Sequence, residues 1–431
     1  MQKYVSKLHT ISLICFVLVF STLYFSHVIQ AQSIDELQTK INQRSKDIKD
    51  LEVEIAKYQK EINALGTQVS SLAATLKSLE LTQKKLEADI KITENRVAEK
   101  NLEIQKLGGQ ISDKVETITQ NRQIITKSLV TMNEYDTRSV PELLLSQESL
   151  SGTWNSLDEI GSIQKALVDR IQDLRKVKAG LEVNKKSTEK ARGELLVLNK
   201  QLKDQRSVVL GTAAEKNKIL KDTKQSESEY QKILAQRRAQ KIEFEKELFQ
   251  FESALHIAID FGSLPSKGSG VLSWPLDNIF ITQQFGVTSA SARLYASGSH
   301  GGMDLRASIG TPVKAALSGV VTDVERVTQK SGCQYGYWVL VRHANGLSTL
   351  YAHLSLVGVN VGQTVGTGQI VGYSGNTGYS EGPHLHFGVY ATEGIRIVTA
   401  DKLNPATSCK GIKTVAADTK AYLDPGAYLP R

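Results

Sequence analysis

Regularly spaced apolar residues between residues 34 and 90 constrain the fold of this chain more than any other feature. They recur three and four positions apart, which keeps them in one seam along a slightly underwound helix, as in a coiled coil. Arg44 and Gln83 interrupt the seam, and polar residues at such positions usually fix register. The seam consists of Leu37, Ile41, Ile48, Leu51, Ile55, Tyr58, Ile62, Leu65, Val69, Leu72, Leu76, Leu79, Leu86 and Ile90.

A second run with similar spacing begins at Ile160 and continues, less regularly, to about Leu255. Each run covers about 100 residues, which corresponds to about 150 Å of helix at 1.5 Å per residue. Two arms of equal length predict an antiparallel coiled-coil hairpin over residues 32–257, with its tip at about 133–159.

The expected tip breaks the helical pattern with Pro141 and Gly152, yet it contains leucines 143–145 and Trp154. Such an apolar cluster is either a docking site for a partner or the core of a small helical cap. We favour the cap, because apolar residues usually pack inside their own chain.

The first 31 residues have the pattern of a targeting segment. Lys3 and Lys7 precede an apolar run over residues 11–25, and the segment ends near Val28-Ile-Gln-Ala31. The chain is therefore expected to be exported to the periplasm or cell envelope, either secreted or anchored in the membrane at its N-terminus. We favour a signal peptide cut after Ala31, since the apolar run is short for a full membrane span.

The composition changes at about residue 258. The 431-residue chain is long for one core, and glycine, valine and tyrosine become frequent in its C-terminal part. Residues 258–270 contain glycines and serines typical of a linker. Residues 271–431 have β-strand patterns, so the fold class is α+β and multidomain: a coiled-coil hairpin followed by a mostly antiparallel β-sheet domain.

One β-hairpin is predicted in detail. Asn345-Gly346 is a strong signal for a two-residue turn, here joining residues 338–344 to residues 347–353. Because side chains alternate between faces, His343 points away from His353 and is expected to have a structural role. The face of His353 holds Trp338, Arg342, Tyr351 and His353.

Three short segments in the C-terminal part contain four of the chain's eight histidines. A lone histidine is usually a satisfied core residue, but imidazole and carboxylate groups at these spacings are the ligands that a hydrolytic zinc ion needs. The segments are His300-Gly-Gly-Met-Asp304, Tyr351-Ala-His353-Leu and Pro383-His384-Leu-His386-Phe387.

Residues 271–431 resemble the LytM/lysostaphin-type zinc endopeptidases, which cut peptide cross-links in bacterial peptidoglycan. The three histidine segments carry the resemblance, together with Gly310-Thr-Pro-Val-Lys-Ala-Ala and the turn-rich stretch from Gly375 to Pro383. The resemblance implies one zinc ion per chain, bound by His300, Asp304 and His386. It also implies that His353 and His384 are catalytic residues beside the metal-bound water.

These roles agree with zinc chemistry, because three protein ligands leave an open position for water. One imidazole of the pair His353 and His384 would take the proton of the water, and the other would stabilise the oxyanion. The sequence does not assign the two roles.

A coiled coil before such a domain is similar to the murein hydrolase activators. Some members of that group lack the metal ligands, switch on separate cell-wall amidases, and dock through their helices with a cell-division ABC transporter. The complete ligand set here favours an enzyme, with peptidoglycan as substrate and the transporter as a partner of the coiled coil. A non-enzymatic activator is the alternative, and a purely structural rod is disfavoured.

The net charge bears on which partners the protein can bind, and the cysteines bear on its redox environment. A net charge of +8 suits anionic wall polymers or lipid headgroups, and no pattern indicates nucleic-acid binding. Outside the cytoplasm Cys333 and Cys409 are either paired in a disulfide or two buried thiols. The helical hairpin is also expected to regulate the enzyme by covering its cleft.

Overall fold

The computed structural model describes residues 33–65, 71–136, 150–255, 257–268, 270–287, 298–326 and 333–431. The expected targeting segment and most of the expected tip, including Pro141, lie outside these ranges. No helix within them is long and apolar enough to cross a membrane. Contacts divide the chain into two compact units, residues 1–43 with 99–192 and residues 44–98 with 193–431.

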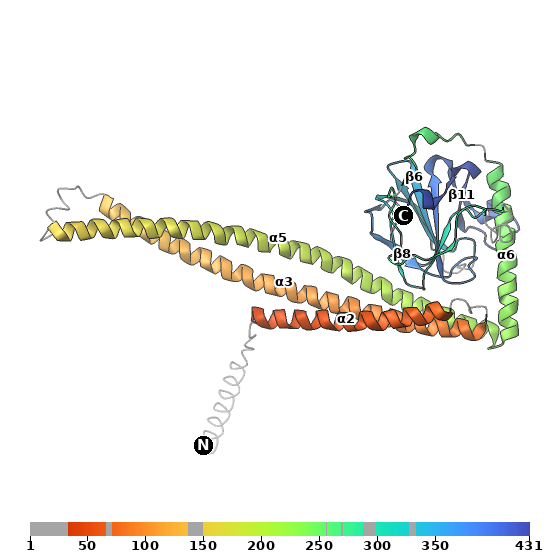
Figure 1. Cartoon of the computed structure of the whole chain (residues 1–431), viewed down its shortest axis with the longest axis horizontal. Helices are drawn as coiled ribbons and strands as arrows, with labels where there is room; N and C mark the ends of the chain where they lie inside the picture. Colours follow the sequence, from red (N-terminus) through yellow and green to blue (C-terminus); the bar gives the residue numbers. More distant parts are fainter. Residues whose placement is uncertain are drawn as a thin grey trace, which may run out of the picture. The chain divides into compact units, whose positions relative to one another are not determined.

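Long helices form the N-terminal half, as predicted (Figure 1). The second expected arm is divided, because the chain leaves the helical conformation at Lys224 and Gln225, which have φ angles of 48° and 60°. The long helices are α2 (Ile34–Leu65), α3 (Leu72–Asp136), α5 (Leu150–Thr223) and α6 (Glu227–Ser253).

Helices α3 and α5 run antiparallel in the first unit. Lys114 Nζ donates to the Gly180 carbonyl oxygen at 3.1 Å, and Asn184 Nδ2 donates to Gln110 Oε1 at 3.1 Å. The residue numbers on α5 thus increase as those of their partners on α3 decrease, as in an antiparallel pair. Several seam positions are buried, among them Leu37, Ile48 and Leu72. Leu79 and Leu86 are buried in a cluster with Val208 of α5 and with Ile309 and Tyr373 of the C-terminal domain.

The C-terminal domain is built on a ten-stranded antiparallel sheet, which confirms the predicted α+β class. Its main path runs β1-β2-β9-β6-β5-β4-β7, while β8 joins β6 to β3 and β12 pairs with β9. The strands are β1 (Ile281–Gln283), β2 (Met303–Arg306), β3 (Pro312–Lys314), β4 (Gly319–Glu325), β5 (Tyr337–His343), β6 (Leu347–Val357), β7 (Thr364–Val365), β8 (Ile370–Ser374), β9 (His384–Ala391) and β12 (Tyr422–Leu423).

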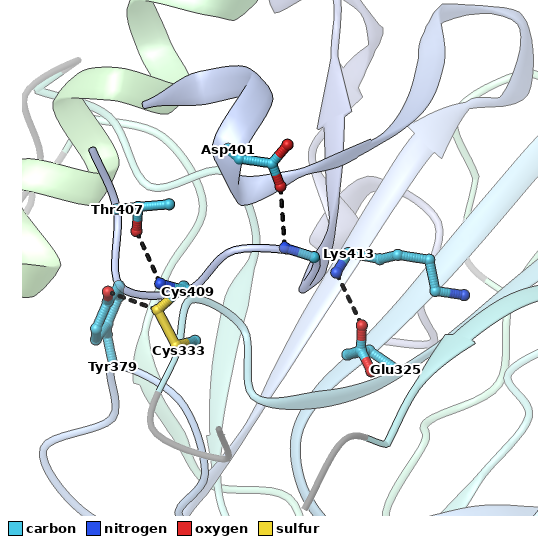
Figure 2. Close-up of a disulfide and its surroundings, with 8 residues drawn as sticks. Glu325, Cys333, Tyr379, Asp401, Thr407, Cys409 and Lys413 are labelled. Carbon is cyan, nitrogen blue, oxygen red and sulfur yellow. Dashed lines mark hydrogen bonds between the residues drawn. A yellow bond between two sulfur atoms is a disulfide. The ribbon is translucent and has the colours of Figure 1, made fainter. Parts of the chain in front are cut away.

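A second, smaller sheet pairs β10 (Ile395–Thr399) with β11 (Lys413–Ala417), and the short helix α8 (Ala400–Leu403) follows β10. The loop after α8 contains Cys409, which forms a disulfide with Cys333 at a Cα–Cα distance of 5.9 Å (Figure 2). Of the two alternatives for these cysteines, the structure therefore has the disulfide.

Two apolar cores lie on the two faces of the large sheet. The inner core includes Leu305, Val339, Tyr351, Leu385 and Phe387. The outer core includes Trp338, Leu350 and Tyr390 of the sheet together with Phe244 and Leu248 of α6. Helix α6 thus packs on the outer face, beside β11 (Figure 1).

The segment expected to be a linker is packed against the domain. Asp260 N donates to Glu393 Oε2 at 3.0 Å, Gly268 N donates to the Ala427 carbonyl oxygen at 3.0 Å, and Leu264 contacts both cores. This packing differs from the mobile connection that the Gly/Ser composition suggests, because composition carries no signal of a long-range contact such as that of Leu264.

The turn between β5 and β6 is one residue longer than predicted. Arg342 pairs with Ser348 and Val339 with Tyr351, so three residues, 344–346, form the loop. Gly346 takes a φ of 81° there, which is compatible with glycine. The predicted register is therefore wrong by one residue along this part of the hairpin.

Candidate metal centre

Three side chains meet on the outer face of the sheet. Asp304 on β2 and His386 on β9 are cross-strand partners, and His300 lies just before β2, where it bridges to Gly286. Asp304 Oδ1 is 3.0 Å from His386 Nδ1 and 3.3 Å from His300 Nε2, and the two ring nitrogens are 3.2 Å apart. The structure thus brings together the three residues expected to bind metal, and they are the one such group in the described ranges.

The spacing of these atoms fits a zinc ion. Two ligands about 2.05 Å from a tetrahedral zinc lie about 3.3 Å apart, close to the separations between the three donors. His300 Nδ1 lies 3.1 Å from the Gln284 carbonyl oxygen, so an N–H there leaves Nε2 free to bind a metal. A Cβ at Gly302 would lie 2.8 Å from the His386 ring, so only glycine fits behind this ligand.

The charges at the centre also suit a cation. Burial opposes ionisation of Asp304, but the neighbouring His300 and His384 and the hydrogen bonds from His300 and His386 bring its pKa well below the ordinary value. Burial lowers the pKa of His386. A carboxylate beside a neutral imidazole is the ligand state that zinc requires.

His353 and His384 lie beside the three donors, as the sequence predicted. Their ring centroids are 4.7 Å apart. His353 Nδ1 lies 2.7 Å from the Thr377 carbonyl oxygen, and His384 Nδ1 lies 2.8 Å from the Gly382 carbonyl oxygen. An N–H at each Nδ1 would donate to these carbonyls and leave Nε2 to face the cavity.

His353 reaches the centre through an irregularity in β6. In a regular strand it would share the face of Tyr351, but Tyr351 enters the inner core while His353 lines the outer-face cavity. Its φ of 57° is left-handed, and the β5–β6 register shifts between Tyr337 and Val339. The bulge thus returns His353 to the outer face, which it shares with Trp338 as predicted, whereas the predicted placement of Tyr351 on that face is wrong because Tyr351 pairs with Val339.

The environment of His353 keeps its imidazole neutral. Burial, reinforced by the nearby His384 and His386, brings its pKa well below the ordinary value. His343 lies on the other face, 3.0 Å from the Ser318 carbonyl oxygen and 2.9 Å from Thr349 Oγ1, which is the structural role predicted for it.

A cavity of about 230 Å³ contains the centre, and helix α6 forms one of its walls. Sequence reasoning missed this wall, because the apolar residues of α6 have the spacing of a coiled-coil seam. It also missed Tyr335, whose ring centroid is 5.5 Å from that of His386. The residues that α6 contributes are Lys241, Phe244, Glu245, Leu248, Phe249 and Glu252.

A site with three clustered donors and two further imidazoles has the composition of a metallohydrolase centre. The model of peptidase family M23 matches residues 298–401, which include all five residues. The chain therefore carries at its C-terminus a peptidase M23 domain of the LytM/lysostaphin type, as the sequence motifs predicted.

Relatives with known names share this segment. It is 49% identical over 88 residues to the DD-carboxypeptidase/endopeptidase Mpg of Neisseria meningitidis, covering 20% of this chain and 19% of that protein. It is 44% identical over 90 residues to lysostaphin of Staphylococcus simulans, covering 21% and 18%. The peptidoglycan DD-endopeptidase ShyA of Vibrio cholerae is 43% identical over 88 residues, covering 20% and 19%. The chain thus spans about a fifth of the length of these relatives.

Solved structures match the same part of the chain. A zinc-containing peptidase from Vibrio cholerae is 30% identical, covering 28% of this chain and 36% of that one, with a TM-score of 0.24. The catalytic domain of lysostaphin is 34% identical, covering 27% and 83%, with a TM-score of 0.23.

Proposed function

We propose that this chain is an exported zinc metalloendopeptidase that hydrolyses peptide cross-links of bacterial peptidoglycan. The observation that carries the proposal is the set of three donors, all within 4.8 Å of one another, with His353 and His384 beside them. The M23 match and the relatives named as endopeptidases, Mpg and ShyA, support the same substrate class.

The zinc ion, when bound, would lower the pKa of water and polarise the scissile carbonyl. His353 is assigned the role of general base, because its depressed pKa leaves the Nε2 lone pair available for a proton. His384, whose Nε2 lies 3.7 Å from Asp304 Oδ1, is assigned the role of stabilising the developing oxyanion. Return of the proton from His353 to the leaving amine completes the hydrolysis.

We also propose that α6 covers the cleft until the helical region is moved. Phe244 packs against Tyr335 and Tyr379, with ring centroids 5.9 and 5.6 Å apart. Glu252, at the end of α6, accepts hydrogen bonds from Ala417 N at 2.9 Å and from the Tyr422 hydroxyl at 2.5 Å. A peptide substrate needs the space that these side chains of α6 occupy. Regulation of cleavage therefore acts on the contact between α6 and the C-terminal domain.

The remaining expectations belong to the same proposal. Residues 1–31 would direct export, and the disulfide fits an oxidising compartment such as the periplasm or the extracellular side of the envelope. Helices α2, α3 and α5 would dock with a membrane partner such as a cell-division ABC transporter, whose movement could shift α6.

The test measures zinc content and cleavage of purified peptidoglycan by the full-length protein, with His386→Ala as control. The expected result is one zinc per chain and new amino termini in the wall peptides, both lost in the variant. A folded protein that binds no zinc, cleaves no peptide and stimulates a cell-wall amidase would favour the non-enzymatic activator instead.

A further inference from the structure

The disulfide Cys333–Cys409 ends a short segment, residues 333–336, that leads into β5 beside the candidate metal centre. We refer to this segment as the brace. We propose that the disulfide, acting through the brace, holds the catalytic His353 in its left-handed conformation, so that peptide cleavage depends on the disulfide while zinc binding does not. The part of this proposal that concerns cleavage rests on the proposed function.

The brace contacts the backbone of His353 directly. His353 N donates to the Tyr335 carbonyl oxygen at 3.0 Å, and this bond forms where the β5–β6 register shifts. A left-handed φ is unfavourable for a residue with a Cβ and persists only when its surroundings enforce it. Two carbonyl groups from outside β6 hold His353 in this conformation. The Tyr335 carbonyl binds its backbone N–H, and the Thr377 carbonyl lies 2.7 Å from its side-chain Nδ1.

Both of these carbonyls belong to one tightly packed unit. Tyr379 N donates to the Gln334 carbonyl oxygen at 2.8 Å, and Tyr337 N donates to Thr377 Oγ1 at 3.0 Å. A Cβ at Gly336 would lie 2.3 Å from Thr377 Oγ1, and a Cβ at Gly378 would lie 2.3 Å from the Gln334 carbonyl oxygen. The brace and residues 377–379 therefore move together, and a shift of one changes both contacts of His353.

The disulfide anchors the first residue of the brace, Cys333, to Cys409. Cys333 and Cys409 are buried with Ala400 and Ile412 in a small apolar cluster. Cys409 N donates to Thr407 Oγ1 at 3.1 Å, and the Tyr379 hydroxyl lies 3.7 Å from Cys409 Sγ. Figure 2 shows both contacts beside the disulfide. The disulfide thus joins the connection between β10 and β11 to the brace, although the two cysteines are separated by 76 residues in the sequence.

The metal donors are held by a different part of the fold. Asp304 and His386 are fixed by the β2–β9 ladder, and His300 by its bridge to Gly286. The Tyr335 ring of the brace lies 5.5 Å from the His386 ring, but the hydrogen bonds that orient the three donors run to the Gln284 carbonyl oxygen and between the donors themselves. Loss of the disulfide should therefore leave the donors in place.

The primary test is amide hydrogen exchange of the full-length protein, which needs no activity. The Cys333→Ser/Cys409→Ser double variant is compared with the wild type. We expect faster exchange at the amides of His353 and Tyr379, whose acceptors lie in the brace, and unchanged exchange at the β2–β9 amides. Equal exchange at all these positions in variant and wild type would overturn the proposal, as would a general increase that includes β2 and β9.

The second test separates positioning from overall stability. The double variant is expected to bind one zinc per chain and to lose about tenfold or more in kcat on a cross-linked peptide, with little change in KM, because general-base catalysis contributes 10²–10⁴-fold. Parallel loss of zinc and activity would contradict the proposal. Failure of the wild type to bind zinc or cleave peptide would refute the proposed function, whereas the exchange experiment would still decide the role of the disulfide at His353.

Discussion

Asp304 and His386 are direct partners across the β2–β9 ladder, with Asp304 Oδ1 3.0 Å from His386 Nδ1. Two of the proposed metal donors are thus fixed by backbone pairing, and His300 needs only a short turn to join them. The proposed catalytic pair is placed differently, since His353 depends on a bulge and a left-handed backbone. Metal binding and catalysis are therefore expected to respond to different substitutions.

Replacement of Asp304 by alanine should abolish zinc binding while the sheet remains folded. The substitution removes the carboxylate that balances the charge of the cation, and it leaves the backbone pairing of β2 intact. Zinc content and a far-ultraviolet circular dichroism spectrum check this expectation. Retention of one tightly bound zinc would contradict the assignment of the ligand.

His353→Ala should retain zinc and lose cleavage by about 10²–10⁴-fold, the usual contribution of a general base. The side chain is not one of the three clustered donors, so the ion keeps its ligands. Metal analysis and peptide hydrolysis on the same preparation provide the measurement. Loss of zinc from this variant would mean that His353 is itself a ligand.

Gly302→Ala should weaken zinc binding although residue 302 is not a donor. The added Cβ would lie 2.8 Å from both the His386 ring and the Phe387 carbonyl oxygen, so His386 must shift. Overpacking of this kind typically costs about 1–3 kcal/mol. Titration with a zinc chelator measures the affinity, and Gly382→Ala is the control because nothing lies within 4 Å of its Cβ position.

Leu248→Ala should increase cleavage by the full-length protein. Leu248 is 3% exposed and holds α6 against the outer core, and a buried leucine-to-alanine change costs about 2–5 kcal/mol. Leu196→Ala on α5 is the matched control, since Leu196 is 73% exposed. If neither variant changes the rate of wall cleavage, α6 does not restrict access to the centre.

The contact of α6 with the domain should weaken as the pH rises. Burial raises the pKa of Glu252 to about 8 from 4.5, against hydrogen bonds from Tyr422 and Ala417, while Glu245 and Asp418 raise it further. Between pH 4.5 and about 8 the Glu252 carboxyl is therefore protonated in the folded state but ionised in the unfolded state. Its contribution to the free energy of unfolding is fully present below pH 4.5 and is lost as the pH rises to about 8.

Glu252→Gln tests this dependence, because its amide oxygen can still accept both hydrogen bonds. The difference in the free energy of unfolding between pH 5 and pH 8 should shrink by roughly a few kcal/mol in the variant. Denaturant unfolding at the two pH values measures it. An identical pH dependence in both proteins would show that Glu252 ionises freely in the folded state.

The sequence alone determined the helical seam and the three histidine segments, because both depend on local patterns, whereas the roles expected of the five residues came from the family resemblance. Seam positions such as Leu37 and Ile48 are buried, and the alternation of His384 and His386 about Leu385 holds in β9. Periodicity and motif spacing report these features directly, since a regular helix or strand converts spacing along the chain into a shared face.

Only the tertiary structure decided the rest. The longer β5–β6 turn, the reversal of His353, the pairing of Cys333 with Cys409 and the packing of Leu264 all depend on contacts between distant segments. Helix α6 has a seam-like sequence that suits a coiled coil, yet Phe244 and Leu248 find their partners on the sheet. An apolar side chain gains free energy from any surface that removes it from water, so its spacing predicts burial but not the surface that buries it.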